Sequence, residues 1–186
     1  MTLNLRLNQQ THLLEPVHFL PSPHQDERPH DAHIDMIVIH GISLPPGQFN
    51  TPAVEQFFCG RLNTSSDPTL LAIANLNVSS HLFIKRTGDI IQFVPFNKRA
   101  WHAGESHFAG KTRCNDFSIG IELEGTDDTP YESVQYQRLA HVVQLLMQAY
   151  AAIVPERIVG HEHIAPGRKT DPGPFFDWQH LKGLIV

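Results

Sequence analysis

Residues 117–125 read Phe-Ser-Ile-Gly-Ile-Glu-Leu-Glu-Gly, and this stretch decides the fold class. Large apolar side chains alternate with small or acidic ones, which is the two-residue period of a β-strand. One face of the predicted strand is apolar, and the other carries small residues that lead to Glu122 and Glu124. We interpret this second face as open space above a sheet with acid at its rim. A solvated outer face is the alternative, because any half-exposed strand alternates in this way.

Other patterns place this strand in an α/β sheet. Residues 36–40 read Met-Ile-Val-Ile-His, and unbroken apolar character predicts a central strand that is covered on both faces. Residues 79–94 hold two β-prone runs around Thr87-Gly88, which predict a β-hairpin. A long helix is predicted to about Ala152, because apolar residues recur every three or four positions after a capping box at residues 129–132.

The remaining elements are predicted to be short. Thr51-Pro52 is expected to begin a short helix, and Asp177 is expected to cap a last helix from Trp178. Ile158-Val159 is predicted to form a short strand. Residues 1 to about 20 are expected to be irregular or weakly paired, and a Pro-rich loop is expected to follow them.

Composition limits the class of protein. A chain of 186 residues with 41% hydrophobic and 18% charged residues suits one globular domain. The formal charge of −5, without a long basic run, argues against a nucleic-acid partner. The first twenty residues hold no continuous apolar stretch, so we expect neither a signal peptide nor a membrane span, and a cytoplasmic location. Cys59 and Cys114 are expected to be free thiols.

Histidine is the unusual residue, with thirteen copies. Residues 160–174 hold His161, His163, Lys169 and Asp171 among several Gly and Pro residues. Imidazole nitrogens and carboxylate oxygens are ligands of a divalent cation such as zinc, and a catalytic zinc takes three protein ligands. Either histidine together with Asp171 would supply two ligands, so a third ligand is required from elsewhere in the chain.

Three other residues carry open alternatives. His40 ends a buried strand beside Gly41, where it is well placed as the third ligand, although His40 taken alone favours a core histidine bonded to a carbonyl. His81 shares a strand face with Phe83, where it either lines a site or covers a sheet edge. Trp101 taken alone favours a core residue over a binding platform.

Four motifs together resemble a known family. They are HGISLPPG at residues 40–47, KRAWHAG at 98–104, CNDFSIGIELEG at 114–125, and residues 160–174 with GH at the start and KTDPGP at the end. The chain resembles the zinc-dependent N-acetylmuramyl-L-alanine amidases, and among these the cytoplasmic 1,6-anhydro-muropeptide amidases of the AmpD type. The resemblance implies a single domain over residues 1–186, with a central mixed β-sheet flanked by helices.

The resemblance also implies a cofactor and a mechanism. Zinc would be held by His40, His161 and Asp171, and His161 is preferred to His163 because the family's ligand follows a glycine. Glu122 would be the general base, and Lys169 would face the developing oxyanion. The substrate would be an anhydro-N-acetylmuramyl peptide, whose bond to L-alanine is hydrolysed in cell-wall recycling.

The substrate contacts follow from the same resemblance. Trp101 and Arg113 would lie near the sugar and peptide, and His81 would lie close to the metal. Gly41 stands where the AmpD type usually has Asn, and Asn77 stands where a basic residue often meets the peptide carboxylate. Two alternatives are a non-catalytic peptidoglycan-recognition module and an amidase that acts on intact peptidoglycan. The full set of ligands, Glu and Lys favours the enzyme.

Overall fold

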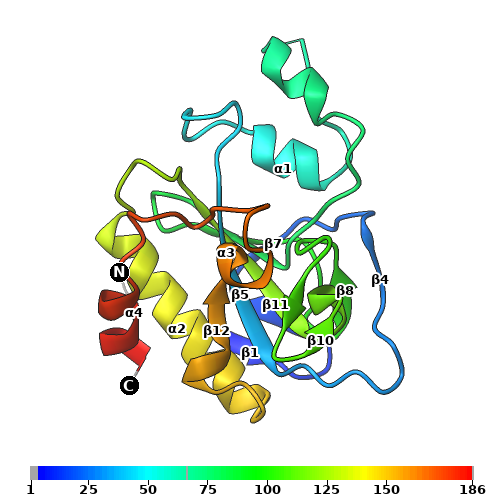
Figure 1. Ribbon diagram of the computed structural model, residues 1–186, viewed down its shortest axis with the longest axis vertical. Coiled ribbons are helices and arrows are strands. Elements are labelled where there is room, and N and C mark those ends of the chain that lie inside the picture. Colours follow the sequence, from blue (N-terminus) through cyan, green and yellow to red (C-terminus); the bar gives the residue numbers. More distant parts are fainter. Residues whose placement is uncertain (1–3, 66, 186) are drawn as a thin grey trace.

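The computed structural model describes residues 4–65 and 67–185, and a six-stranded mixed sheet lies at its centre (Figure 1). Its strands run in the order β12 (Ile158–Gly160), β5 (Met36–Ile42), β11 (Ser118–Glu124), β6 (Leu82–Ile84), β7 (Ile90–Gln92) and β3 (His18–Phe19). The first four of these run parallel to one another, and β7 runs antiparallel to β6. The predicted central strand and the predicted hairpin are therefore confirmed.

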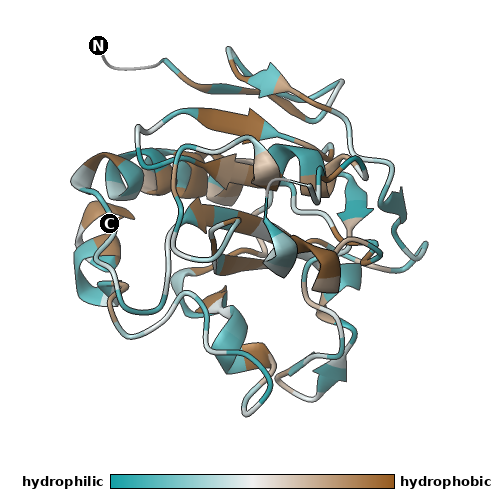
Figure 2. Cartoon of the chain, turned by 90° about the horizontal axis from the view of Figure 1, so that it is seen from above, coloured by the Kyte–Doolittle hydropathy of each residue, from teal (hydrophilic) through white to brown (hydrophobic). Residues whose placement is uncertain are grey.

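One face of the sheet is covered by α2 (Ser133–Ala149) and α4 (Trp178–Ile185), which lie side by side (Figure 1). The apolar side chains of β5 and β11 on this face share a core with the buried stripe of α2. Leu14 from the N-terminal region and Leu181 from α4 belong to the same core. Hydrophobic residues accordingly gather in the strands and helices at the centre, while the surrounding loops are mostly hydrophilic (Figure 2).

The opposite face carries the residues that concern function. It is covered by the short helix α3 (His161–Ile164) and by the segment that holds β8 (Lys98–Ala100), β9 (His107–Phe108), β10 (Lys111–Thr112) and the 3-10 helix η2 (Cys114–Asp116). A further apolar cluster includes α1 (Ala53–Phe58) and Leu70 of the 3-10 helix η1 (Pro68–Ala72). Because Ser118 and Glu124 are almost wholly buried, the solvated outer face weighed for β11 is wrong.

The N-terminal region is more ordered than its sequence predicts. β1 (Arg6–Asn8) and β2 (Leu13–Glu15) form an antiparallel hairpin, β3 joins the edge of the main sheet, and β4 (Gln25–Glu27) pairs with β8. Short pairing of this kind agrees with the weakly paired form of the expectation, and the irregular form is wrong for the residues that the structure describes. These strands have two or three residues each, so they are too short to show a clear period.

The start of α2 also differs from the prediction. Thr129 forms an isolated bridge with Thr126, and the capping box uses Glu132 and Gln135 instead. The buried Gln135 amide explains the choice, because it donates to the carbonyls of Ile84 (3.2 Å) and Glu124 (3.1 Å), while its oxygen accepts the Glu132 N–H. The start of α2 is therefore set by the tertiary hydrogen bonds of Gln135 and not by the capping pattern at residues 129–132.

Several smaller predictions are confirmed. Asp177 caps α4, since its carboxylate accepts the backbone N–H of His180 at 2.8 Å. Cys59 and Cys114 are free thiols. Short 3-10 turns complete the chain, including η3 (Pro155–Arg157) before β12. Over residues 4–65 and 67–185, none of the helices is long and apolar enough to span a membrane.

Candidate metal centre

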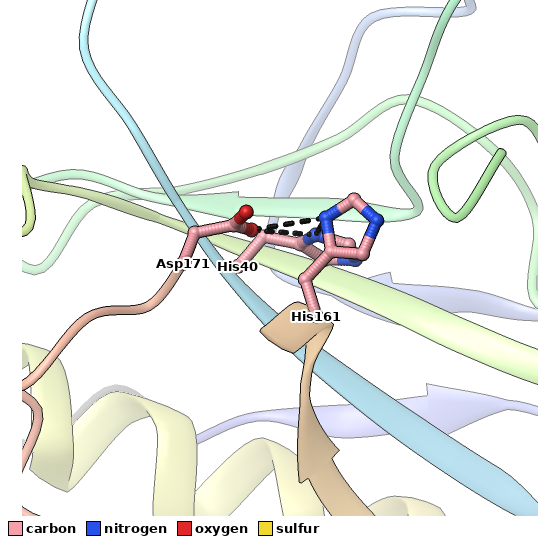
Figure 3. A group of neighbouring side chains, drawn as sticks. All are labelled: His40, His161 and Asp171. Carbon is pink, nitrogen blue, oxygen red and sulfur yellow. Dashed lines mark hydrogen bonds and ion pairs between the residues drawn. The ribbon is translucent and has the colours of Figure 1, made fainter. Parts of the chain in front are cut away.

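The predicted ligands come from three separate elements that end at one edge of the sheet. β5 carries His40 near its carboxyl end, and β12 leads directly into His161 at the start of α3. Asp171 follows on the loop after α3 and points back toward both imidazoles (Figure 3). The carboxyl ends of neighbouring parallel strands meet at the same edge of a sheet, which is where α/β proteins commonly bind ligands.

Three donor atoms form a nearly equilateral triangle. The Nδ1 atoms of His40 and His161 lie 3.0 Å apart, and each lies 3.1 Å from Oδ2 of Asp171. Ligand atoms on a tetrahedral zinc with bonds of about 2.0–2.2 Å are separated by roughly 3.3–3.6 Å, slightly more than the sides of this triangle. The triangle therefore fits a small divalent cation, and the structure brings together the residues that could hold one.

The second nitrogen of His161 supports this fit. His161 Nε2 lies 3.2 Å from the carbonyl oxygen of Ala103, which can only accept a hydrogen bond. Nε2 therefore carries the ring hydrogen, and Nδ1 presents a lone pair to His40 and Asp171. A lone pair close to a carboxylate oxygen is unfavourable by itself and favourable around a cation, so the donor set has the chemistry of a metal site.

Protonation of these groups is consistent with metal binding. Burial lowers the pKa of His40 to about 4, although the nearby Asp171 carboxylate acts in the opposite direction. Burial alone would raise the pKa of Asp171, but its close contacts with the His161 and His40 rings hold that pKa far below its usual range. A neutral imidazole and an ionised carboxylate are the forms that bind metal ions.

Glu122 lies beside the ligands because of strand register. β11 pairs with β5 in parallel, and the pairing sets Glu122 opposite His40. Burial raises the pKa of Glu122 well above its usual value, Asp171 raises it further, and the charge of Lys169 lowers it. Glu122 Oε2 is buried and has no hydrogen-bond partner among the residues that the structure describes. A buried carboxylate without a partner needs one, and a reacting group in the cavity would supply it.

A cavity of about 260 Å³ lies over these residues. The polar part of its lining includes the three ligands, Glu122 and Lys169. The other side is an apolar wall made by Leu44, Phe57, Phe58, Ile73, Leu76 and Val78. A mostly apolar pocket with a few convergent polar groups is the usual form of a small-molecule site.

His163 and His81 are placed away from this cavity. His163 is exposed, and its Nδ1 accepts the backbone N–H of Gly160 at 2.9 Å, so it is no part of the donor triangle. His81 is fully buried, with Nδ1 accepting the N–H of Gly120 at 3.0 Å and Nε2 lying 3.1 Å from the carbonyl of Lys98. This geometry does not support the direct substrate contact expected of His81, because its ring is enclosed by protein.

Trp101 and Arg113 do not line the cavity over the ligands. Trp101 is half-buried, and its Nε1 donates to Asp26 at 3.1 Å. Arg113 is exposed, pairs with Asp116 at 3.1 Å, and lines a separate cavity of about 570 Å³ together with Arg168. Their roles in substrate binding stay predictions.

One residue of the site was missed by sequence reasoning. His102 is buried, and its Nδ1 lies 2.9 Å from the Nε2 of His40. Its only sequence signal was its position beside Trp101 in the second of the four motifs.

Comparison with known proteins identifies the family of the chain. The family described as N-acetylmuramoyl-L-alanine amidase matches residues 30–174, which is most of the chain. The chain belongs to this family. The family match covers the donor triangle and Glu122 together, and the α/β fold predicted from the sequence resemblance is confirmed by solved structures of similar shape.

Similar proteins include characterised members of this amidase family. The 1,6-anhydro-N-acetylmuramyl-L-alanine amidase AmpD of Salmonella typhimurium is 52% identical over 167 residues, covering 90% of this chain and 89% of that protein. The AmpD of Escherichia coli is 51% identical over 166 residues, covering 89% and 90%. A crystal structure of a selenomethionine AmpD derivative superposes with a TM-score of 0.92 at 49% identity, covering 95% and 98% of the two chains.

A substrate complex is also similar in structure. The amidase AmiD of Escherichia coli, solved with anhydro-N-acetylmuramic acid-L-Ala-D-γ-Glu-L-Lys, superposes with a TM-score of 0.61 at 33% identity. The superposition covers 86% of this chain and 61% of AmiD.

Proposed function

We propose that this amidase hydrolyses the amide bond between N-acetylmuramic acid and L-alanine in 1,6-anhydro-muropeptides during recycling of the cell wall. The names of the AmpD relatives and the ligand in the AmiD complex support this substrate class. The observation that carries the proposal is that His40, His161, Asp171 and Glu122 line one cavity.

The proposed cofactor is zinc, held by His40, His161 and Asp171. Two imidazole nitrogens and one carboxylate oxygen are a common set for catalytic zinc, which keeps a fourth position open. When bound, such an ion polarises an amide carbonyl and lowers the pKa of water, so that hydroxide is available as a nucleophile at neutral pH. Support comes from the spacing of the three donor atoms and from the family of the chain.

Glu122 is proposed as the general base and acid. Its carboxylate takes one proton from the attacking water while the oxygen bonds to the amide carbon, and it then gives that proton to the departing alanine nitrogen. The carbon–nitrogen bond breaks, which leaves a carboxylic acid on the muramyl lactyl group and a free amine on the peptide. The raised pKa of Glu122 brings its basicity nearer to neutral pH.

Lys169 is proposed to stabilise the negative oxygen that develops on the amide carbon. It lines the cavity, and its positive charge lowers the pKa of both Glu122 and His40, so the charge lies close to both groups. A fixed donor to an oxyanion typically accelerates a reaction by 10²–10³-fold.

The remaining expectations join this proposal. We place the reaction in the cytoplasm on the resemblance to the AmpD type, and we assign the sugar and peptide contacts to Trp101 and Arg113. Residues 1–186 are proposed to act as one amidase domain, since Leu14 near one end and Leu181 near the other share a core with the central sheet.

The test is hydrolysis of a defined substrate. Zinc-loaded protein is mixed with anhydro-N-acetylmuramic acid-L-Ala-D-γ-Glu-L-Lys, and the free tripeptide L-Ala-D-γ-Glu-L-Lys and free anhydro-N-acetylmuramic acid are sought by mass spectrometry. We expect both products, each at one equivalent per substrate cleaved. The Glu122→Gln variant, which keeps size and the metal ligands, is the control and is expected to form both products about 10²–10⁴-fold more slowly.

Two outcomes would contradict the proposal. Substrate that binds with measurable affinity but stays intact after long incubation with confirmed zinc would indicate a peptidoglycan-recognition module. Equal turnover on intact peptidoglycan and on the soluble fragment would indicate an amidase that is not specialised for recycling.

A further inference from the structure

The nitrogen of His40 that faces away from the donor triangle begins a buried chain of hydrogen bonds. His40 Nε2 lies 2.9 Å from Nδ1 of His102, and His102 Nε2 lies 3.1 Å from Oγ of Ser118. Ser118 Oγ lies 2.6 Å from the carbonyl oxygen of Cys114. All four residues are buried, and Ser118 and Cys114 are wholly so.

The last member of the chain fixes the direction of every bond in it. A carbonyl oxygen only accepts, so Ser118 must use its single hydroxyl hydrogen to donate to Cys114. Ser118 then accepts from His102, whose hydrogen is therefore on Nε2 and whose Nδ1 is an acceptor. His40 must donate to that acceptor from Nε2, which leaves a lone pair on His40 Nδ1, the atom in the donor triangle.

The segment that carries His102 is itself held in place. The side-chain oxygen of Asn115 accepts the backbone N–H groups of His102 at 3.1 Å and Ala103 at 2.8 Å. The carbonyl of Ala103 is the acceptor for His161, so adjacent residues orient both imidazole ligands. The His102 ring packs directly on Gly120 of β11, at a position where a Cβ would clash with the ring.

We propose that His102 is a positioning residue that, through Ser118 and the Cys114 carbonyl, holds His40 in its metal-binding tautomer. This inference rests on the proposed zinc site. The hydrogen-bond partner of a ligating histidine is more often a carboxylate, a carbonyl or water. Here the partner is a second neutral imidazole, whose tautomer is fixed by Ser118 and the Cys114 carbonyl. The fold therefore selects the metal-binding form of His40 before any ion arrives.

The test compares two serine variants with the same chemical change. Ser118→Ala removes the hydroxyl that fixes His102, and Ser80→Ala removes an equally buried hydroxyl that donates only to the carbonyl of Gly120 at 2.8 Å. Zinc affinity is measured by competition with a chromogenic chelator. We expect Ser118→Ala to bind zinc about tenfold more weakly, at the lower end of the effect of outer-sphere partners, and Ser80→Ala to stay within twofold of wild type. His102→Leu is expected to bind 10–100-fold more weakly.

A second measurement reports the tautomer directly. Long-range ¹H–¹⁵N spectra of zinc-free protein are expected to show His40 protonated on Nε2 in wild type and Ser80→Ala. In Ser118→Ala, a population protonated on Nδ1 is expected to appear, which a general loss of stability would not produce. His40 protonated mainly on Nδ1 in wild type, or equal zinc affinity in the two serine variants, would overturn the proposal.

The experiment separates this proposal from the proposed function. If wild type binds zinc and cleaves the muropeptide while Ser118→Ala matches Ser80→Ala in zinc affinity, the positioning role is wrong and the amidase assignment stands. If wild type binds no zinc, the metal site is wrong and the positioning role is wrong with it.

Discussion

The substitution Gly120→Ala tests how closely the sheet packs under the site. Gly120 lies in the middle of β11, and its missing side chain leaves the space that the His102 ring occupies. A Cβ at this position would lie 2.7 Å from both Cδ2 and Nδ1 of His102, and closer still to Cγ. Carbon atoms pack best at about 3.5–4.0 Å, so the ring would have to move by roughly 1 Å.

The energetic effect follows from what holds the ring. His102 is buried and is bonded at both nitrogens, so it cannot move without losing a hydrogen bond to His40 or Ser118. Overpacking of a rigid core costs about 1–3 kcal/mol, and one lost buried hydrogen bond adds about 1 kcal/mol. We expect Gly120→Ala to lower the free energy of unfolding by about 3 kcal/mol and Tm by roughly 6–12 °C for a chain of this length.

The assay is urea unfolding at pH 7.5 followed by circular dichroism, together with zinc affinity by chelator competition. Gly183→Ala in α4 is the matched control, because a Cβ there meets nothing within 4 Å. The control is expected to be unchanged or up to about 1 kcal/mol more stable, since alanine favours a helix more than glycine does. Surface substitutions usually change the free energy of unfolding by no more than roughly 0.5 kcal/mol. If the free energy of unfolding of Gly120→Ala lies within about that amount of the wild-type value, and its zinc affinity is unaltered, the packing argument is refuted.

Three further predictions concern the site. Glu122→Gln is expected to keep one zinc per chain while turnover falls by about 10²–10⁴-fold, whereas Asp171→Ala is expected to lose the zinc itself. Metal analysis together with the hydrolysis assay distinguishes the two roles, and equal zinc content in the two variants would contradict them. Lys169→Met is expected to lower kcat by about 10²-fold with little change in KM, which steady-state kinetics would check. Burial lowers the pKa of His81 and His102 well below 6.5, so below that pH the unfolded chain binds protons that the folded chain does not. The free energy of unfolding should therefore fall as pH drops below about 6.5, by up to about 1.4 kcal/mol per pH unit for each histidine. Glu122, whose pKa is raised, acts with the opposite sign but offsets only one histidine. Urea unfolding of chelator-treated protein between pH 7.5 and 5 would test this, and a free energy of unfolding that does not change with pH would contradict it.

The strands and helices that could be predicted are those in which a long apolar period dominates. β11 and α2 have seven and seventeen residues, enough for their buried faces to be visible in the sequence. Strands of two or three residues in the N-terminal region show no period, and the start of α2 depends on hydrogen bonds from Gln135 to distant carbonyls. Their placement is decided by partners that the local sequence does not contain.

The candidate site divides in the same way. The residue types of a zinc site were visible in the sequence, and the resemblance to a family chose among the histidines. Whether Glu122 lies beside His40 depends on the parallel register of β5 and β11. Which nitrogen of each histidine binds depends on the hydrogen bonds made with His102 and the Ala103 carbonyl. His102 could not be assigned, because its task is defined by a neighbour 62 positions away.

The hydrogen-bond partners of the two histidine ligands lie on one short segment that includes His102 and Ala103, and this segment sets the tautomers of the ligands. Two neutral imidazoles have two tautomers each, and only one of the four combinations presents both Nδ1 lone pairs to Asp171. His102 and the carbonyl of Ala103 select that combination, and Asn115 holds both residues in place. Binding of the metal and order in this segment are therefore linked, since each favours the other by the same free energy. Because Trp101 precedes His102 directly, a substitution that loosens the segment is expected to weaken zinc binding and the predicted sugar contact together.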